Sequence, residues 1–89
     1  MIEQDLKIIN RLGIHARPAA QIAQTAARFA CEVRLTKDDV TVDAKSIMGV
    51  MMLAAEFGAS VHVTTNGSDE QQAADALKTL FENKFDEEF

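Results

Sequence analysis

Apolar and polar residues alternate along four short stretches of the chain, a pattern typical of strands that bury one face. The predicted strands are residues 2–9, 32–36, 40–43 and 60–65. In the first, Gln4 is a polar exception on the side that should be buried. Residues 37–39 form a turn, so the second and third strands should make a hairpin. The polar alternates expected to face water are Lys7, Arg34, Thr41 and His62.

Three other stretches have apolar residues at a helical period. The first is residues 16–30, whose many alanines favour a helix that lies close to a sheet. The second is the short apolar segment 47–55, with Ser46 as its N-cap. The third follows a turn at Asn66 and a capping box at residues 68–71, and precedes an acidic tail at residues 83–89. Residues expected to be buried on this last helix are Ala73, Ala76, Leu77, Leu80 and Phe81.

The order of these elements, β-α-β-β-α-β-α, indicates an α+β fold. We expect a four-stranded, mainly antiparallel sheet with three helices packed on one face. The 89 residues should form one domain, 1–89, because a chain of this length has room for only one small core.

Composition and charge restrict the classes of function. The net charge of -5 and the pI near 4.8 argue against nucleic-acid binding, which needs clustered Lys and Arg. The single cysteine, Cys31, excludes an internal disulfide and a CxxC pair, and we expect it to be buried. The N-terminus does not resemble a signal peptide, and no apolar run is long enough to span a membrane. We therefore expect a cytoplasmic protein without membrane or nucleic-acid partners.

The chemistry is concentrated where the first helix should begin. Gly13 permits a tight turn, Pro18 fits the first helical turn, and His15 and Arg17 lie between them. Unpaired backbone N–H groups, here those of Ala16 and Arg17, and the positive end of the helix dipole favour an anion. A histidine at such a place is a nucleophile that can carry a phosphoryl group, and the Arg17 guanidinium can hold two phosphate oxygens.

Two motifs resemble those of the HPr family, the histidine-containing phosphocarriers of the bacterial phosphotransferase system. Residues 13–19, Gly-Ile-His-Ala-Arg-Pro-Ala, resemble its active-site motif. Residues 46–51, Ser-Ile-Met-Gly-Val-Met, resemble its regulatory motif at the family's spacing. The resemblance implies an open-faced β-sandwich and a carrier, not an enzyme. His15 would accept a phosphoryl group on Nδ1 from enzyme I, next to Arg17, and donate it to a IIA protein in sugar uptake.

The resemblance also assigns roles to the segment that begins at Ser46. In some family members an HPr kinase/phosphorylase modifies the equivalent serine, so we expect regulatory phosphorylation of Ser46. A phosphate there would again lie at a helix N-terminus. The expected partner-contacting residues are Ile47, Met48 and Met51, since a short helix cannot bury apolar residues on every side. A carrier that engages several partners briefly should be a monomer with small interfaces.

Several alternatives remain open at this stage. Leu12, three residues before the histidine, and the pattern around Phe81 and Phe85 look more like the nitrogen-branch carrier, NPr. From another class, a ferredoxin-like module that binds a small molecule or a metal has a similar order of elements. A purely regulatory homologue would be expected to lack the histidine. No group of side chains has metal-ligand spacing, so we expect neither a metal nor a cofactor.

Overall fold

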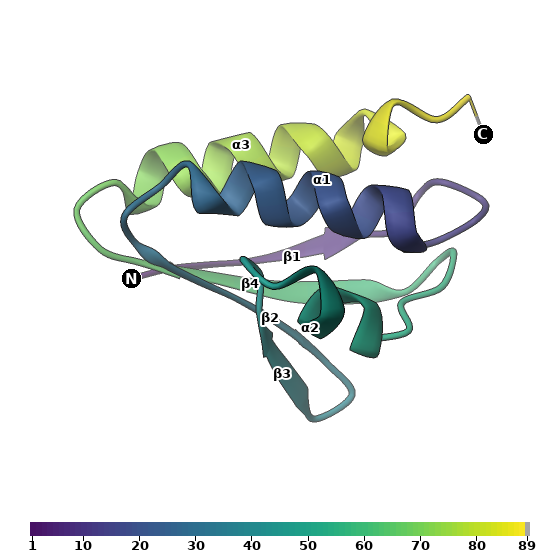
Figure 1. Cartoon of the computed structure of the whole chain (residues 1–89), viewed down its shortest axis with the longest axis horizontal. Coiled ribbons are helices and arrows are strands. Elements are labelled where there is room, and N and C mark those ends of the chain that lie inside the picture. Colours follow the sequence, from purple (N-terminus) through teal and green to yellow (C-terminus); the bar gives the residue numbers. More distant parts are fainter. Residues whose placement is uncertain (89) are drawn as a thin grey trace.

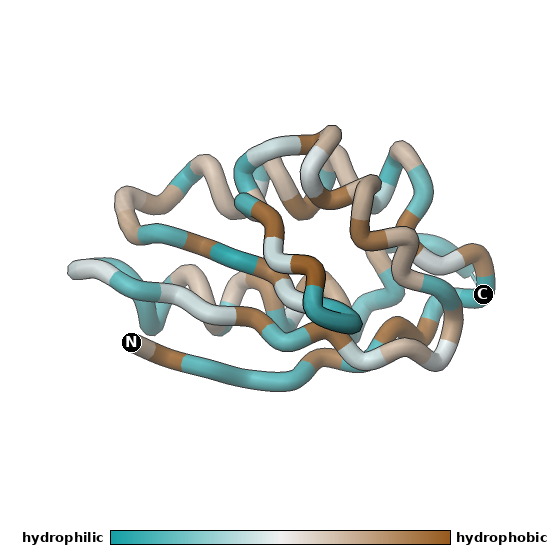
Figure 2. Tube along the Cα trace, turned by 90° about the horizontal axis from the view of Figure 1, so that it is seen from below, coloured by the Kyte–Doolittle hydropathy of each residue, from teal (hydrophilic) through white to brown (hydrophobic). Residues whose placement is uncertain are grey.

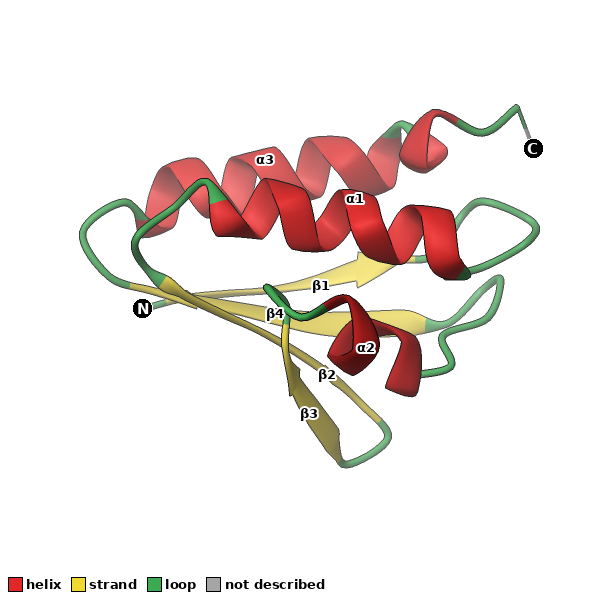
Figure 3. Ribbon diagram, in the orientation of Figure 1, coloured by secondary structure: helices red, strands yellow, loops and turns green. Residues whose placement is uncertain are grey.

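The computed structural model describes residues 1–88 of the chain. Four strands and three α-helices follow one another in the predicted order, and a single turn of 3-10 helix, η1, comes last (Figures 1 and 3). Within these residues no helix has the length and apolar character needed to cross a membrane. The elements are β1 (Ile2–Lys7), α1 (Ala16–Ala27), β2 (Glu32–Lys37), β3 (Val40–Asp43), α2 (Ile47–Met52), β4 (Ser60–Asn66), α3 (Glu70–Glu82) and η1 (Lys84–Asp86).

The sheet has the strand order β1-β4-β2-β3, and every neighbouring pair is antiparallel. β4 therefore lies between the first two strands of the chain. The prediction of a four-stranded antiparallel sheet is confirmed. On its open face His62 is hydrogen-bonded through Nδ1 to Asp5 and through Nε2 to Glu3, at 2.9 and 3.0 Å.

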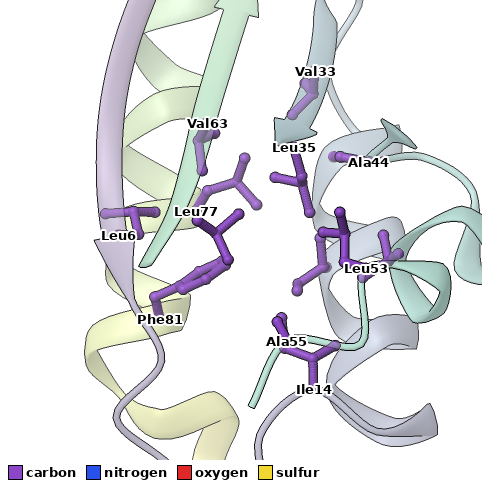
Figure 4. Packing of buried hydrophobic residues seen from close by; sticks show 14 of the residues in the cluster. Leu6, Ile14, Val33, Leu35, Ala44, Leu53, Ala55, Val63, Leu77 and Phe81 are labelled. Atoms are coloured by element: carbon purple, nitrogen blue, oxygen red, sulfur yellow. The ribbon is translucent and has the colours of Figure 1, made fainter. Parts of the chain in front are cut away.

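The helices cover the other face of the sheet and enclose one core. Apolar segments alternate with polar ones along the trace (Figure 2), so each element turns one side inward. In Figure 4, Leu6 and Val63 of the sheet lie near Leu77 and Phe81 of α3. Cys31 is buried, as predicted. The largest fully buried apolar side chains are Phe81, Phe85, Ile8, Ile22, Leu35, Leu77, Val33, Val50, Val61 and Val63.

Three predicted elements end earlier in the structure. The N–H of Ile8 donates to the carbonyl oxygen of Ala59, in the turn before β4, at 2.8 Å. β1 therefore ends at Lys7. α1 ends at Ala27. After it, the N–H of Phe29 donates to the carbonyl oxygen of Ala26, three residues earlier, which is a tighter turn than that of an α-helix. α2 ends at Met52, and Ala54 has a φ of 50°, which a right-handed α-helix does not accommodate.

The predicted capping box of α3 is wrong. The N-cap is Asp69, and its side chain makes no capping bond. Its carboxylate instead accepts the backbone N–H groups of Ala30 and Cys31, at 2.8 and 2.9 Å, and so ties α3 to the chain before β2. The buried face of α3 is also slightly rotated from the prediction. Ala74 is buried, whereas Ala76 and Leu80 are half-buried.

The C-terminal segment is more than an acidic tail. Phe85 is fully buried and packs edge-on against Phe81, with ring centroids 4.9 Å apart. Lys84, Phe85 and Asp86 all have positive φ angles, between 54° and 61°, so the chain turns back after α3. The predicted tail also included Phe89, which lies outside the described residues.

Candidate functional site

The loop before α1 is shaped by Gly13, whose φ is +69°. A Cβ atom there would lie 2.7 Å from the Ala55 carbonyl oxygen, so only glycine fits. Next to it, Ile14 N–H donates to the same Ala55 oxygen at 2.9 Å. The loop is therefore held against the segment that follows α2.

His15 is the N-cap of α1, as the sequence predicts. Its backbone is extended, and its carbonyl accepts the first helical bond, from Ala19 N–H at 3.0 Å. Its side chain makes no capping bond, so the imidazole is free for other contacts. The N–H groups of Ala16 and Arg17 precede the first helical donor, Ala19, and Pro18 has no N–H. The N–H groups of Ala16 and Arg17 are thus the helix's unpaired donors beside His15.

The imidazole of His15 is held by the C-terminal segment. Its Nε2 lies 2.6 Å from Oε2 of Glu87. The other Glu87 oxygen, Oε1, accepts from Nδ2 of Asn10 at 2.7 Å, and that amide also donates to the Gly13 carbonyl at 2.8 Å. The Glu87 side chain is only 8% exposed, whereas that of His15 is 39% exposed. One ring nitrogen is therefore engaged inside the protein while the ring remains accessible.

The charge state of Glu87 follows from these contacts. Burial raises the pKa of this carboxyl, but the hydrogen bonds from Asn10 and His15 and the positive charge of Arg17 outweigh burial and lower its pKa below the ordinary value. Glu87 is thus a carboxylate at neutral pH and can only accept hydrogen bonds. The proton in the contact must then be on Nε2 of His15.

Arg17 lines an open groove of about 410 Å³ together with Glu87, whose carboxylate contacts the imidazole. Its side chain is exposed, and its charge acts on Glu87 across the groove. The structure thus places His15 and Arg17 at the start of α1, beside carboxylates that the prediction lacked, and their role in phosphate binding stays a prediction. The groove is lined by Leu12, Arg17, Asp86, Glu87 and Glu88.

Ser46 is the N-cap of α2, as predicted. Its Oγ accepts from Gly49 N–H at 3.0 Å, and its carbonyl accepts from Val50 N–H. Val50 is the residue of α2 that is buried. The other apolar side chains of this short helix therefore remain in contact with water.

A set of exposed apolar residues lies on the loop before α1, on α2 and on the loop after α2. Met48 is 74% exposed, and Ile47 and Met51 are each 43% exposed, as a docking role requires. Leu12 and Phe57, 63% and 58% exposed, lie on the two loops joined by the Ile14–Ala55 hydrogen bond. We call the full set the docking face; it comprises Leu12, Ile47, Met48, Met51, Met52 and Phe57.

Two residues of the site were not predicted from the sequence, Asn10 and Glu87. Asn10 is fully buried, although it lies in the loop between β1 and α1. For Glu87 a sequence feature was available. Phe85 follows Phe81 by four residues, a spacing that suggests an aromatic returning to the core and carrying the acidic tail back with it.

Comparison with known proteins identifies the family of this chain over nearly its full length. Residues 2–83 match the family model described as the phosphotransferase-system HPr component phosphorylation site. The phosphocarrier protein HPr of Cupriavidus necator is 51% identical over 98% of both chains. That of Treponema pallidum is 47% identical over 99% of this chain and all of its own. The crystal structure of HPr from Thermoanaerobacter tengcongensis superposes with a TM-score of 0.95 at 45% identity, covering both chains completely. The ferredoxin-like alternative is therefore wrong.

Proposed function

The chain belongs to the HPr family of phosphocarrier proteins, and on that premise we propose that His15 carries a phosphoryl group between two partner proteins. The donor in this proposal is enzyme I, loaded from phosphoenolpyruvate. The acceptors are IIA proteins or domains that serve sugar uptake in the cytoplasm. The observation that carries the proposal is the position of His15: it is the N-cap of α1, yet its ring does not cap the helix.

The site suits a phosphoryl group once that group is attached. The N–H groups of Ala16 and Arg17 and the helix dipole provide positive potential where the phosphate oxygens would lie. Arg17 adds a guanidinium that can contact two oxygens. Phosphoryl transfer depends mainly on positioning and charge stabilisation, and the partner supplies the remainder of the site. The protein would then act as a carrier and not as a catalyst on its own.

We assign recognition of these partners to the docking face. Ile47, Met48 and Met51 are the residues that the family resemblance points to, and their exposure leaves them available. Methionine side chains are flexible and polarizable, which suits a surface that must fit several proteins in turn. Leu12 and Phe57 extend the same apolar surface toward His15.

Regulation at Ser46 is the second part of the proposal. A kinase/phosphorylase would add a phosphate to the hydroxyl that now caps α2. The added charge would lie at a helix N-terminus and leave the fold intact. It would also lie next to Ile47 and Met48 and oppose docking of enzyme I, because an apolar contact is weakened by a neighbouring dianion.

A nitrogen-branch carrier with a regulatory output is the second candidate. Leu12 is exposed beside the site, and the tail with Phe81 and Phe85 folds back to it, which are the features that resemble NPr. The names of the curated relatives, phosphocarrier protein HPr, favour the sugar branch.

A relay assay tests the proposal and separates the two branches. The protein is loaded with enzyme I and labelled phosphoenolpyruvate, purified, and mixed with a sugar-specific IIA or with a nitrogen-branch IIA. We expect faster transfer to the sugar-specific protein. Preferential transfer to the nitrogen-branch IIA would select the second candidate, and transfer to neither would remove both.

A further inference from the structure

Glu87 has a defined place in the site that phosphate binding alone does not explain. A carboxylate repels a phosphate, yet this one is buried within hydrogen-bond distance of the nucleophile, His15. Its two oxygens each have one partner, His15 and the fully buried Asn10. Since Asn10 also holds the Gly13 carbonyl, the carboxylate is fixed relative to the loop and not only to the ring.

The chain reaches this position through an unfavourable backbone. Lys84, Phe85 and Asp86 are three successive non-glycine residues with φ near +55° to +61°, a region that L-residues rarely adopt. Burial of Phe85 and the bond from Glu87 N–H to Lys84 O at 3.0 Å hold the turn. Figures 1 and 2 place this segment at the same end of the molecule as the loop between β1 and α1. Strain kept next to a nucleophile points to a role in its chemistry.

The contact also distinguishes the two ring nitrogens. Glu87 contacts Nε2 of the ring, and its carboxylate accepts a hydrogen bond from the N–H at that nitrogen. In a neutral imidazole the proton on one nitrogen leaves a lone pair on the other. Nδ1, on the other side of the ring, then has the lone pair that a nucleophile needs. Glu87 therefore leaves the attacking position open.

We propose that Glu87 is a positioning residue for phosphoryl transfer at His15: it holds the proton on Nε2, keeps Nδ1 as the nucleophile and pairs with the charge that the ring gains. In the step itself the Nδ1 lone pair forms the N–P bond. The bond between phosphorus and the donor breaks, and its electron pair leaves with the donor. No proton has to move, and the ring becomes a cation against the Glu87 carboxylate. The inference rests on the proposed function.

Three variants test it. In Glu87→Gln the side-chain carbonyl can still accept from Nε2 but has no charge, whereas Glu87→Ala removes both acceptor and charge. Glu82→Gln is the matched control, because Glu82 is exposed at the end of α3 and does not line the groove. We expect the kcat for loading by enzyme I to fall on the order of tenfold in Glu87→Gln and further in Glu87→Ala, with KM unchanged, as loss of a charge-assisted contact predicts. Glu82→Gln should load like the wild type.

Nitrogen-15 NMR of the His15 ring gives an independent measurement that needs no partner. The wild type and Glu87→Gln should hold the proton on Nε2, and Glu87→Ala should show a mixture of tautomers. Unchanged tautomers in Glu87→Ala, or loading of both Glu87 variants as fast as the wild type or faster, would overturn the inference. Faster loading would indicate that the tail blocks the site. If the wild type is not loaded at all, the proposed carrier function fails, while the NMR result still decides the role of Glu87.

Discussion

Ile14 donates its backbone N–H to the carbonyl oxygen of Ala55 at 2.9 Å, and both side chains are buried, 8% and 3% exposed. Figure 4 shows the two side chains next to each other at the edge of the core. Ile14 immediately precedes His15, and Ala55 comes three residues after the end of α2. The hydrogen bond thus joins the loop that carries His15 to the segment that follows α2.

This junction depends on Gly13. In Gly13→Ala the new Cβ would approach the Ala55 oxygen to 2.7 Å, in a backbone with φ of +69°. The left-handed backbone costs about 1–2 kcal/mol and overpacking adds about 1–3 kcal/mol, so we expect a loss of about 2–5 kcal/mol in the free energy of unfolding. Urea denaturation measures it.

Gly58→Ala is the control for the backbone contribution. Gly58 also has a positive φ, +89°, but a Cβ there meets no atom within 4 Å. This variant should lose only the left-handed cost, about 1–2 kcal/mol. Equal losses in the two variants would show that the close approach to Ala55 is unimportant.

The docking face predicts an effect on affinity without an effect on folding. Met48→Glu places a charge on a side chain that is 74% exposed, so stability should change by less than about 0.5 kcal/mol. The KM of enzyme I for the variant should rise on the order of tenfold, equivalent to about 1.4 kcal/mol of binding. Gln72→Glu, an exposed residue near the start of α3, adds the same charge at the other end of the molecule and should leave KM unchanged.

Ser46 predicts separable effects on stability and on loading. Ser46→Ala removes the acceptor of Gly49 N–H and should cost about 1 kcal/mol in the free energy of unfolding. Ser46→Asp keeps a capping oxygen and should lose less, since Asp is as good an N-cap as Ser. The KM of enzyme I should rise in Ser46→Asp and stay near the wild-type value in Ser46→Ala, because only Ser46→Asp adds a charge beside Met48. A KM raised equally by both variants would argue against charge as the regulatory signal.

His62 predicts a pH dependence of stability. Hydrogen bonds to Asp5 and Glu3 raise the pKa of its imidazole above the ordinary value of about 6.5. The charged ring is thus favoured in the folded state, and its stabilisation is complete below the unfolded pKa and is lost as pH rises through the folded pKa. His62→Gln should therefore be less stable than the wild type at pH 5.5, and the difference should shrink by pH 9. A difference that grows with pH would contradict this.

The alternating and helical patterns predicted the four strands and the three α-helices, because each is set by local sequence and a single buried face. What they missed depends on contacts between distant residues. Residues 68–71 were predicted to cap their own helix, but Asp69 accepts from Ala30 and Cys31, about forty residues earlier in the chain. Strand order likewise depends on pairing across the chain, such as Leu35 with Val63.

In the candidate site, too, the sequence identified the residues that lie in short motifs and missed those that meet only in the folded chain. His15, Arg17 and Ser46 were identified because each lies in a short motif whose residues act on one helix end. Asn10 and Glu87 are 77 residues apart and meet only through the turn that follows α3. Three successive left-handed residues without a glycine give no local signature of such a turn, and only the spacing of Phe81 and Phe85 indicates that the tail returns to the core. Burial of Phe85 offsets the cost of this left-handed backbone, and that burial depends on the packed core.

Direct mapping of the phosphoryl group tests the carrier function most closely. The wild type and a folded His15→Ala variant are each incubated with enzyme I, phosphoenolpyruvate and magnesium, kept at alkaline pH, and examined by phosphorus NMR and by mass spectrometry of peptides. We expect one acid-labile, alkali-stable phosphoryl group on Nδ1 of His15 in the wild type and none in His15→Ala. An unlabelled wild type, or an equally labelled His15→Ala, would contradict the carrier function.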